Sequence, residues 1–271
     1  MPDPMNRLAV TFITKNEERN LPLALASVKD LADELIVADS GSTDRTLQTA
    51  TDAGARIYAR VWSGFADQRN FAGEQATCEW ILALDADEEL SGELQASLRG
   101  WKAREPEFDA YEFSRCAKYL GKWIRHSGWY PDRKVRLYRR GSGRFEGAAH
   151  DSFRTSGRIG RLQGDLLHHA FETTAQHETT VEVYSSAAAQ ELFAAGKRRS
   201  GAALAFAPAW TFFRRIVLQA GFLDGARGWQ IARLSARYTR LKYEKLARLA
   251  RGESLPDPGS QAASAARDGA P

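Results

Sequence analysis

Residues Trp80–Leu90 read Trp-Ile-Leu-Ala-Leu-Asp-Ala-Asp-Glu-Glu-Leu and carry the strongest fold signal in the sequence. The apolar run Ile81–Leu84 predicts a buried strand, because a central strand of a covered parallel sheet is apolar on both faces. The run ends in Asp85-x-Asp87, and the carboxyl ends of strands are where open α/β sheets bind their ligands. Two carboxylates at this spacing suit one Mg²⁺ or Mn²⁺ ion, whereas Asp-x-Asp alone is more often a solvated acidic turn.

Three shorter strand candidates precede this stretch, at Leu8–Ile13, Leu35–Ala38 and Ala55–Ala59. Each is followed by a polar turn and a helical pattern, and this alternation predicts a parallel α/β nucleotide-binding domain over roughly the first hundred residues. Neither a Gly-x-Gly-x-x-Gly after the first strand nor a Walker-type Gly-Lys-Ser/Thr occurs in the sequence. A dinucleotide oxidoreductase and a P-loop NTPase are therefore disfavoured.

The turns after these strands carry polar side chains with assignable roles. Asn20 is the predicted N-cap of the first helix, and Thr43 is the predicted cap of a helix that begins near Asp44. Asp39 closes the second strand, where it can accept hydrogen bonds from a ribose or a base, or else belong to a capped surface turn. Arg69 follows, and its guanidinium matches the geometry of a diphosphate, although an isolated Arg is usually a surface charge.

Four ordered motifs resemble those of family 2 glycosyltransferases, whose catalytic domain has the GT-A fold. They are Thr14-Lys15-Asn16-Glu17, Asp39-Ser40-Gly41-Ser42-Thr43-Asp44, Gln68-Arg69-Asn70 and Leu84-Asp85-Ala86-Asp87-Glu88. The resemblance covers about Leu8–Leu249, and the downstream sequence is similar to the bacterial lipopolysaccharide core branch, which adds a hexose to the inner-core heptose. The fold that it implies is α/β, a GT-A (Rossmann-like nucleotide-diphospho-sugar transferase) domain with a C-terminal helical appendage.

The resemblance also implies roles for individual residues. The nucleotide sugar would be bound by Thr14, Asn16, Glu17, Asp39, Arg69 and Asp85. Within this set, Arg69 would meet the base or the diphosphate, and Asp85 would face the ribose and the metal. Asp87 would be the direct ligand of Mg²⁺ or Mn²⁺. A divalent cation suits this chemistry independently, because it stabilises the departing nucleoside diphosphate.

Direct displacement at the anomeric carbon needs a carboxylate that takes the proton of the acceptor hydroxyl. One base without a covalent intermediate gives inversion, and family 2 enzymes are inverting. The candidates are Asp151 and, behind it, Glu146. The related branch carries a His-acid pair at this place, which His150-Asp151 matches with the shorter Asp where Glu is expected.

An aromatic and Arg-rich segment after the Asp-x-Asp motif suits a sugar-phosphate acceptor, because aromatic faces stack on sugar C–H groups. The acceptor-binding candidates are Trp129, Arg133 and Arg136, although Trp129 can also simply cover the core. His168 is the candidate for a further metal ligand or a phosphate contact, ahead of His169. A lone buried His is more often a hydrogen-bonded core residue.

The sequence divides into a GT-A catalytic domain over residues 1–175, a helical, basic, membrane-interface appendage over 176–250 and a disordered tail over 251–271. The apolar run Leu204–Phe213 is interrupted by Arg214-Arg215, which is more typical of an interfacial segment than of a bilayer span. The last helix, Trp229–Leu249, sets apolar residues against basic ones. One interpretation is that the basic side of this helix attracts an anionic membrane surface. The alternative is that the helix packs on the catalytic domain and its basic side remains solvated.

Composition points to a cytoplasmic protein: no signal peptide is recognisable, and Cys78 and Cys116 fit plain core thiols. Together the patterns predict an inverting, metal-dependent hexosyltransferase, peripheral on the inner membrane, that moves glucose from UDP-glucose to a lipid-linked glycan, with lipopolysaccharide inner core favoured. The alternatives are another envelope glycan or a polyprenyl-phosphate carrier as acceptor, or a non-catalytic sugar-nucleotide-binding scaffold. Nucleic-acid binding is disfavoured, because no nucleic-acid module is recognisable.

Overall fold

The computed structural model describes residues 6–147, 151–197 and 201–255, with the side chains of 201–205 left out. The chain divides into two compact units. The first comprises Met1–Cys116 and Asp132–His169, and the second comprises Ala117–Pro131 and Ala170–Pro271. The second unit thus takes up a short internal segment that the sequence assigned to the catalytic domain.

The first unit contains α1 (Leu21–Val28), α2 (Thr46–Asp52), α3 (Phe65–Glu74) and α4 (Gly92–Lys102). Its strands are β1 (Leu8–Thr14), β2 (Glu34–Asp39), β3 (Arg56–Ala59), β4 (Trp80–Asp85), β5 (Glu88–Leu90), β8 (Asp132–Arg139), β9 (Gly143–Glu146) and β10 (Ser152–Thr155). Two long strands, β6 (Ala110–Tyr119) and β11 (Ile159–Phe171), begin in the first unit and end in the second. The second unit adds β7 (Lys122–Trp123), α5 (Thr174–Ala194), α6 (Gly201–Phe213), the π-turn η1 (Arg214–Leu218), the 3₁₀-turn η2 (Gly221–Asp224) and α7 (Ala226–Ala250).

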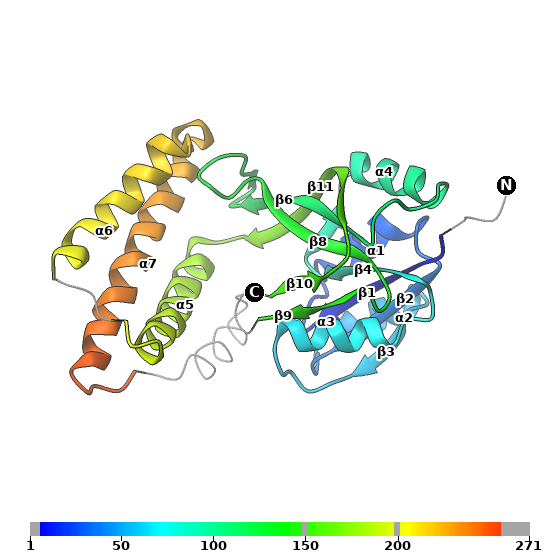
Figure 1. Cartoon of the computed structure of the whole chain (residues 1–271), viewed down its shortest axis with the longest axis horizontal. Helices are drawn as coiled ribbons and strands as arrows, with labels where there is room; N and C mark the ends of the chain where they lie inside the picture. The colour runs from blue at the N-terminus through cyan, green and yellow to red at the C-terminus, as the bar shows by residue number, and fades with distance from the viewer. Residues whose placement is uncertain (1–5, 148–150, 198–200, 256–271) are drawn as a thin grey trace. The chain divides into compact units, whose positions relative to one another are not determined.

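Among the described residues the main sheet has nine strands in the order β3-β2-β1-β4-β8-β6-β11-β5, with β7 paired to β6 (Figure 1). The four strands from β3 to β4 run parallel, as predicted, and β8 then pairs with β4 in the antiparallel sense. Thr14 lies opposite Asp39, and Ile13 lies opposite Asp85. The parallel register therefore brings the carboxyl ends of β1, β2 and β4 to one edge of the sheet.

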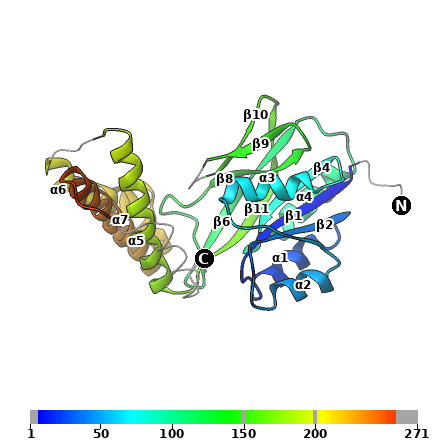
Figure 2. The same ribbon diagram turned by 90° about the horizontal axis from the view of Figure 1, so that it is seen from below.

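Helices cover both faces of this parallel part (Figure 2). Val10 and Phe12 of β1 belong to the same buried cluster as Leu25 of α1, whereas Ile13 packs with Ala72 of α3. Alternate residues of a strand point to opposite faces, so a strand covered on both sides must be apolar at every position. All seven residues of β1 are buried, which explains why its sequence reads as one apolar and threonine run.

Of the two predicted helix caps, Asn20 has the predicted position and Thr43 does not. Asn20 occupies the N-cap position of α1, although its side chain makes no capping bond; its side-chain amide donates to Glu17 Oε2 at 2.9 Å. Thr43 does not cap α2, because that helix begins at Thr46 and the backbone N–H of Thr46 donates to Asp44 Oδ1 at 2.9 Å. The short Asp carboxylate reaches the amide two residues ahead, a usual Asx arrangement.

In the second unit, helices α5 and α7 pack together around a buried lysine. Lys245 of α7 is 9% exposed, and its Nζ donates to Glu182 Oε2 at 3.0 Å, to Ser185 Oγ at 2.8 Å and to Ser186 Oγ at 2.9 Å. Helix α5 begins at Thr174, two residues before the predicted start of the helical appendage at residue 176. Of the tail predicted to be disordered, residues 256–271 lie outside the described part of the chain. None of the described helices is long and apolar enough to span a membrane.

Candidate active site

The loops after β1 and β2 are tied together by one buried carboxylate. Asp39 is 3% exposed, and its Oδ2 accepts the backbone N–H groups of Gly41 and Ser42, each at 2.8 Å. Its Oδ1 accepts the hydroxyls of Thr14, at 3.0 Å, and Ser42. These four bonds make Asp39 the residue that shapes the loop. The alternative of a capped surface turn foresaw the bonds within the turn but not the burial of Asp39. A nucleoside contact by Thr14 or Asp39 stays a prediction.

Asn16 holds the first loop against the second. It adopts a left-handed backbone conformation, with φ of 57°, that costs little for Asn. Its N–H donates to Ser42 Oγ at 2.8 Å, and its Oδ1 accepts the N–H of Thr43 at 2.8 Å. Asn16 itself remains exposed at the carboxyl edge of the sheet, where a nucleotide can reach it.

Glu17 lies in a field of negative charge. Its N–H donates to Thr46 Oγ1 at 2.7 Å, which fixes the backbone. Burial, then the charge of Asp87 and those of Asp44 and Asp85, raise the pKa of Glu17 to about 7. An excess of carboxylates around one group is the electrostatic condition that favours binding of a cation.

Arg69 and Arg136 hold Asp85 from both sides. Arg69, 2% exposed, forms ion pairs with Asp85 Oδ1 and with Asp151 Oδ2. Arg136, 3% exposed, donates Nη2 to Asp85 Oδ2 at 3.0 Å and to Glu88 Oε1 at 3.1 Å. Burial alone would raise the pKa of Asp85, but the two guanidinium groups outweigh it and hold the pKa well below its usual range. Asp85 is therefore a fixed, ionised anchor.

Glu88 completes this network, and its role was missed from the sequence. It is fully buried, its Oε2 accepts the N–H of Asp85 at 3.1 Å, and Arg115 approaches its Oε1 at 3.3 Å. Arg115 also donates to Asp132 Oδ2 at 2.7 Å. The only sequence signal for this role of Glu88 was the cluster of acidic residues directly after β4. Pairing with arginines that are distant in the sequence accounts for that cluster.

Asp87 and His168 are two of the three residues predicted to hold a metal, and Asp85 is the third. His168 Nε2 lies 3.1 Å from Asp87 Oδ2. In the register of β11 and β5, His168 stands opposite Glu88, so its side chain shares the face of the Asp85 network. His169 takes the other face and pairs with Glu89 Oε1 at 3.1 Å. Burial lowers the pKa of His168, but the charge and hydrogen bond of Asp87 outweigh it and leave the pKa raised.

The donor set fits a divalent metal. A carboxylate oxygen and an imidazole nitrogen are suitable ligands for Mn²⁺, and Asp87 and His168 present them to each other at hydrogen-bond distance. The raised pKa of Glu17 marks negative charge that a cation would relieve. No group of three or more His, Cys, Asp or Glu arranged to hold a metal occurs within residues 6–147, 151–197 and 201–255.

Of the two candidate bases, Asp151 belongs to this network and Glu146 stays exposed on β9. The β9 strand is anchored to α3 by Asn70, whose amide donates to the carbonyl oxygen of Phe145 at 2.9 Å and accepts its N–H at 2.8 Å. The predicted His-acid pair cannot be followed, because His150 lies outside the described residues.

The three acceptor candidates lie in different environments. Arg136 is buried in the ion network, so its charge is already used there. Arg133 is half-exposed on β8, with its Nε 3.8 Å from Glu112 Oε1. Trp129 belongs to the second unit, where it packs edge-on against Tyr119 with ring centroids 5.5 Å apart. A covering role in that aromatic cluster is thus what the structure describes for Trp129.

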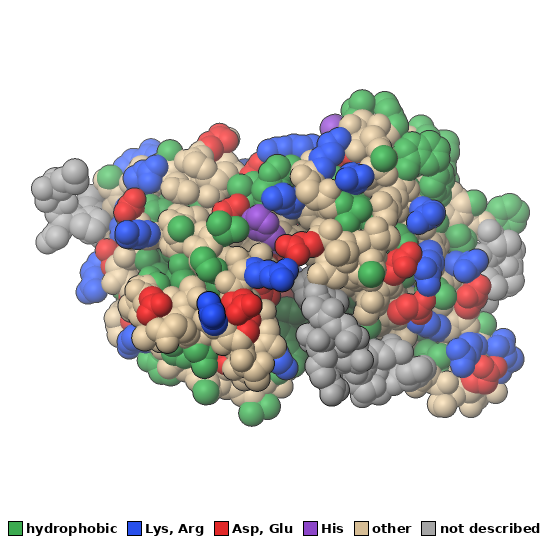
Figure 3. Space-filling model, turned by 180° about the vertical axis from the view of Figure 1, so that it is seen from behind, with side chains coloured by type: hydrophobic (Ala, Val, Ile, Leu, Met, Phe, Trp, Pro, Cys, Tyr) green, Lys and Arg blue, Asp and Glu red, His purple; other side chains and the backbone are tan. Residues whose placement is uncertain are grey.

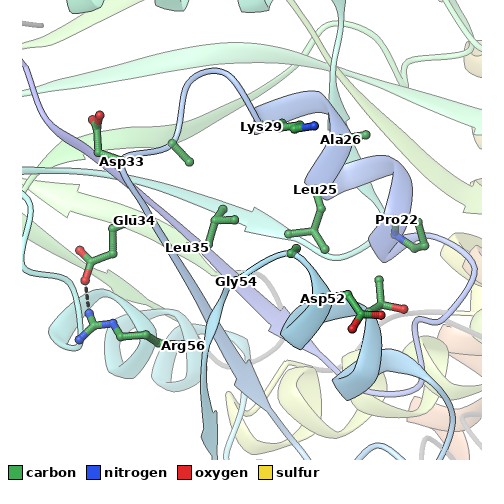
Figure 4. A pocket seen from close by; sticks show the side chains of 13 residues that line it. Pro22, Leu25, Ala26, Lys29, Asp33, Glu34, Leu35, Asp52, Gly54 and Arg56 are labelled. Atoms are coloured by element: carbon green, nitrogen blue, oxygen red, sulfur yellow. Dashed lines mark hydrogen bonds and ion pairs between the residues drawn. The ribbon is translucent and has the colours of Figure 1, made fainter.

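A hollow of about 760 Å³ lies away from these residues (Figure 4). It is bordered by Leu25 of α1, by Asp52 of α2 and by Glu34 and Leu35 at the start of β2. The amino-terminal end of a parallel strand is opposite to the edge where α/β sheets bind ligands. We therefore place the candidate site at the ion network and not in this hollow.

Comparisons with known proteins give the family of the chain and several relatives. Residues 10–157 match the model described as Glycosyl transferase family 2. An uncharacterized glycosyltransferase of Rickettsia typhi is 31% identical and aligns over 88% of this chain and 86% of its own. The lipopolysaccharide core biosynthesis glycosyltransferase LpsC of Rhizobium meliloti is 30% identical over 90% and 93%. The crystal structure of S. aureus TarS 1-349 in complex with UDP-GlcNAc is 16% identical, with a TM-score of 0.45 over 92% and 93%.

Proposed function

Because the chain belongs to glycosyl transferase family 2, we propose that it transfers a hexose, glucose from UDP-glucose, to a lipid-linked glycan with lipopolysaccharide inner core as acceptor. The acceptor is supported by the likeness to LpsC, which is named for lipopolysaccharide core biosynthesis. We place the reaction at the cytoplasmic face of the inner membrane, where the protein would be peripheral.

One observation carries the proposal: a pair of metal-type ligands stands beside a neutralised carboxylate at the carboxyl edge of the sheet. Asp87 and His168 form the pair, and Asp85 is held between Arg69 and Arg136. A metal bound by Asp87 and His168 would supply positive charge to the diphosphate as it departs. Arg69 of α3, the predicted diphosphate contact, would supply a fixed positive charge from that helix.

The residues of this chain divide the remaining work. The loop of Thr14, Asn16 and Glu17 would hold the nucleoside, with Asp39 fixing its shape. The acceptor oxygen attacks the anomeric carbon, the bond from that carbon to the diphosphate oxygen breaks with its electron pair going to the diphosphate, and the acceptor proton passes to Asp151. Arg69 binds Oδ2 of Asp151, so we assign Oδ1 as the proton acceptor. One displacement inverts the anomeric configuration.

The structure supplies a matched pair for the test. Asp87–His168 and Glu89–His169 are the same kind of carboxylate–imidazole contact, each at 3.1 Å, on opposite faces of β11. Release of UDP is measured with purified protein, a panel of nucleotide sugars, lipopolysaccharide acceptors or polyprenyl phosphate, and Mn²⁺, Mg²⁺ or EDTA. We expect turnover of UDP-glucose that needs the metal and the lipopolysaccharide acceptor. Asp87→Asn should lower kcat/KM at least about 100-fold, and Glu89→Gln should leave it within about threefold.

Three outcomes would contradict parts of the proposal. Equal turnover with EDTA and with Mn²⁺ would contradict the proposed requirement for a metal. Equal losses for Asp87→Asn and Glu89→Gln would move the metal site elsewhere. Transfer to polyprenyl phosphate in preference to lipopolysaccharide would replace the acceptor but keep the donor chemistry.

A further inference from the structure

A contiguous stretch of the second unit exposes large apolar side chains along α6, η1, η2 and the start of α7. We call it the apolar face; it consists of Phe206, Trp210, Phe213, Val217, Leu218, Phe222, Leu223 and Trp229. Their exposed fractions run from 45% for Phe213 to 74% for Phe206. Figure 3 shows a gathering of hydrophobic side chains at its upper right, with Lys and Arg side chains beside it. Such clustering, unlike single exposed apolar residues, marks an interaction surface.

The turns that present this face are built rigidly. Asp224 is 3% exposed, and its Oδ2 accepts the hydroxyl of the buried Ser127 at 2.8 Å. Arg215 Nη1 donates to the carbonyl oxygen of Ser127 at 2.7 Å. Gly221 and Gly228 approach so closely that a Cβ at Gly228 would come within 1.8 Å of the Gly221 carbonyl oxygen. The polar groups of the turn are thus used internally while Phe222 and Leu223 point outward, so little order has to be gained on docking.

The sequence segment that carries the face is basic. Between Glu191 and Glu244 the only acidic residue in the sequence is Asp224, and every other charged residue there is Lys or Arg. Asp224 is buried, so it adds no charge to the exposed surface. Arg214 is exposed within the face, directly after Phe213. An apolar surface with aromatic residues and bordering cations is the pattern of proteins that lie in the headgroup region of an anionic bilayer.

We propose that the apolar face docks on an anionic lipid bilayer. A second copy of the chain is a poorer occupant, because a two-fold contact places the same patch on both partners and would set Arg214 and its neighbouring cations against each other. Anionic headgroups neutralise these cations while Trp210, stacked on Phe213 with centroids 5.8 Å apart, enters the interface. The inference rests on the proposed function, which calls for a lipid-linked acceptor, and names the surface that meets the lipid.

The test is co-sedimentation of the full chain with vesicles of phosphatidylcholine, with and without phosphatidylglycerol, at physiological salt. No donor or acceptor is added, so the result does not depend on transfer. We expect binding to the vesicles that contain phosphatidylglycerol. The triple variant Trp210→Ser/Phe213→Ser/Phe222→Ser should bind at least about tenfold more weakly, and Arg214→Glu about tenfold more weakly.

Matched controls come from the first unit, where Leu23 and Ile159 are exposed to 46% and 45%. Leu23→Ser/Ile159→Ser should bind vesicles as the wild type does. Circular dichroism and UDP binding establish that each variant is folded. If the wild type itself does not bind UDP, that result counts against the proposed function and not against docking. The docking proposal is overturned if the wild type does not bind anionic vesicles, or if the triple variant binds them equally well. It is also overturned if sedimentation velocity finds a dimer that the triple variant dissociates.

Discussion

Replacing Arg136 with Met should destabilise the protein through charge and not through volume. Met has a similar length, but it leaves Asp85 and Glu88 without the guanidinium that lies 3.0 and 3.1 Å from them. Breaking a buried ion pair by removing one partner costs about 3–5 kcal/mol. Each carboxylate keeps one other arginine, Arg69 and Arg115 respectively, so we expect the lower end, about 3 kcal/mol, in urea unfolding at neutral pH.

The pH dependence identifies the cause. The folded pKa of Asp85 lies below the unfolded value, so its contribution to stability is present above the unfolded pKa of about 4 and is lost as pH falls through the folded pKa. Removing Arg136 raises the pKa of Asp85, because one of the guanidinium groups that lower it is gone. Protonation then relieves the unpaired charge, so the deficit of Arg136→Met should shrink as the pH is lowered from about 7 to about 4.5.

Two variants separate this account from a general effect of truncation. Arg133→Met changes a half-exposed arginine on the same strand, with its partner at 3.8 Å, and should cost no more than about 0.5 kcal/mol. Arg136→Met combined with Glu88→Gln should cost less than the sum of the two single variants, because one of the stranded charges is gone. A deficit under about 1 kcal/mol, or one that is equal at both pH values, would refute the reasoning.

Three further predictions concern Glu17, Asn70 and Lys245. Burial and nearby carboxylates raise the folded pKa of Glu17 to about 7. The contribution of Glu17 to folding stability is therefore favourable below its unfolded pKa and is lost as the pH rises through about 7. In urea unfolding, Glu17→Gln should stabilise the protein by about 1–2 kcal/mol near pH 8 but hardly near pH 5. Asn70→Ala removes both bonds to Phe145 and should lower kcat more than it changes the KM for the donor, by steady-state kinetics. Lys245→Met removes the bonds from its buried ammonium group to Ser185 and Ser186, while the 41% exposed Glu182 keeps Arg237; it should cost about 1–2 kcal/mol by thermal unfolding.

The fold was predictable because its signals are local. The apolar run before Asp85 and the alternation of strand and helix depend only on neighbouring residues, and the family match confirms the predicted GT-A fold and the glycosyltransferase class. That class also removes the support for a non-catalytic scaffold. The ion network was not predictable, because Arg136 stands 51 residues from Asp85 and 48 from Glu88, and they meet only in the folded sheet. Asn20 stands at the predicted N-cap position, but its backbone is helical, with φ of −93° and ψ of −40°, and not in the extended conformation that usually lets an N-cap side-chain oxygen accept a helix N–H.

The network also separates two aspartates that the sequence presents as equivalent. Asp85 has guanidinium groups on both of its oxygens, and two such partners leave a third cation little to gain there. Asp87 is paired with His168, whose imidazole can give up its proton and turn the same nitrogen toward a metal. An incoming cation would therefore displace only the proton of His168 at Asp87, whereas at Asp85 it would compete with the permanent charges of Arg69 and Arg136. The first exchange is the easier one, so we expect the motif to provide one ligand, Asp87, and one anchor, Asp85. Arg69 of α3 and Arg136 of β8 would set that division.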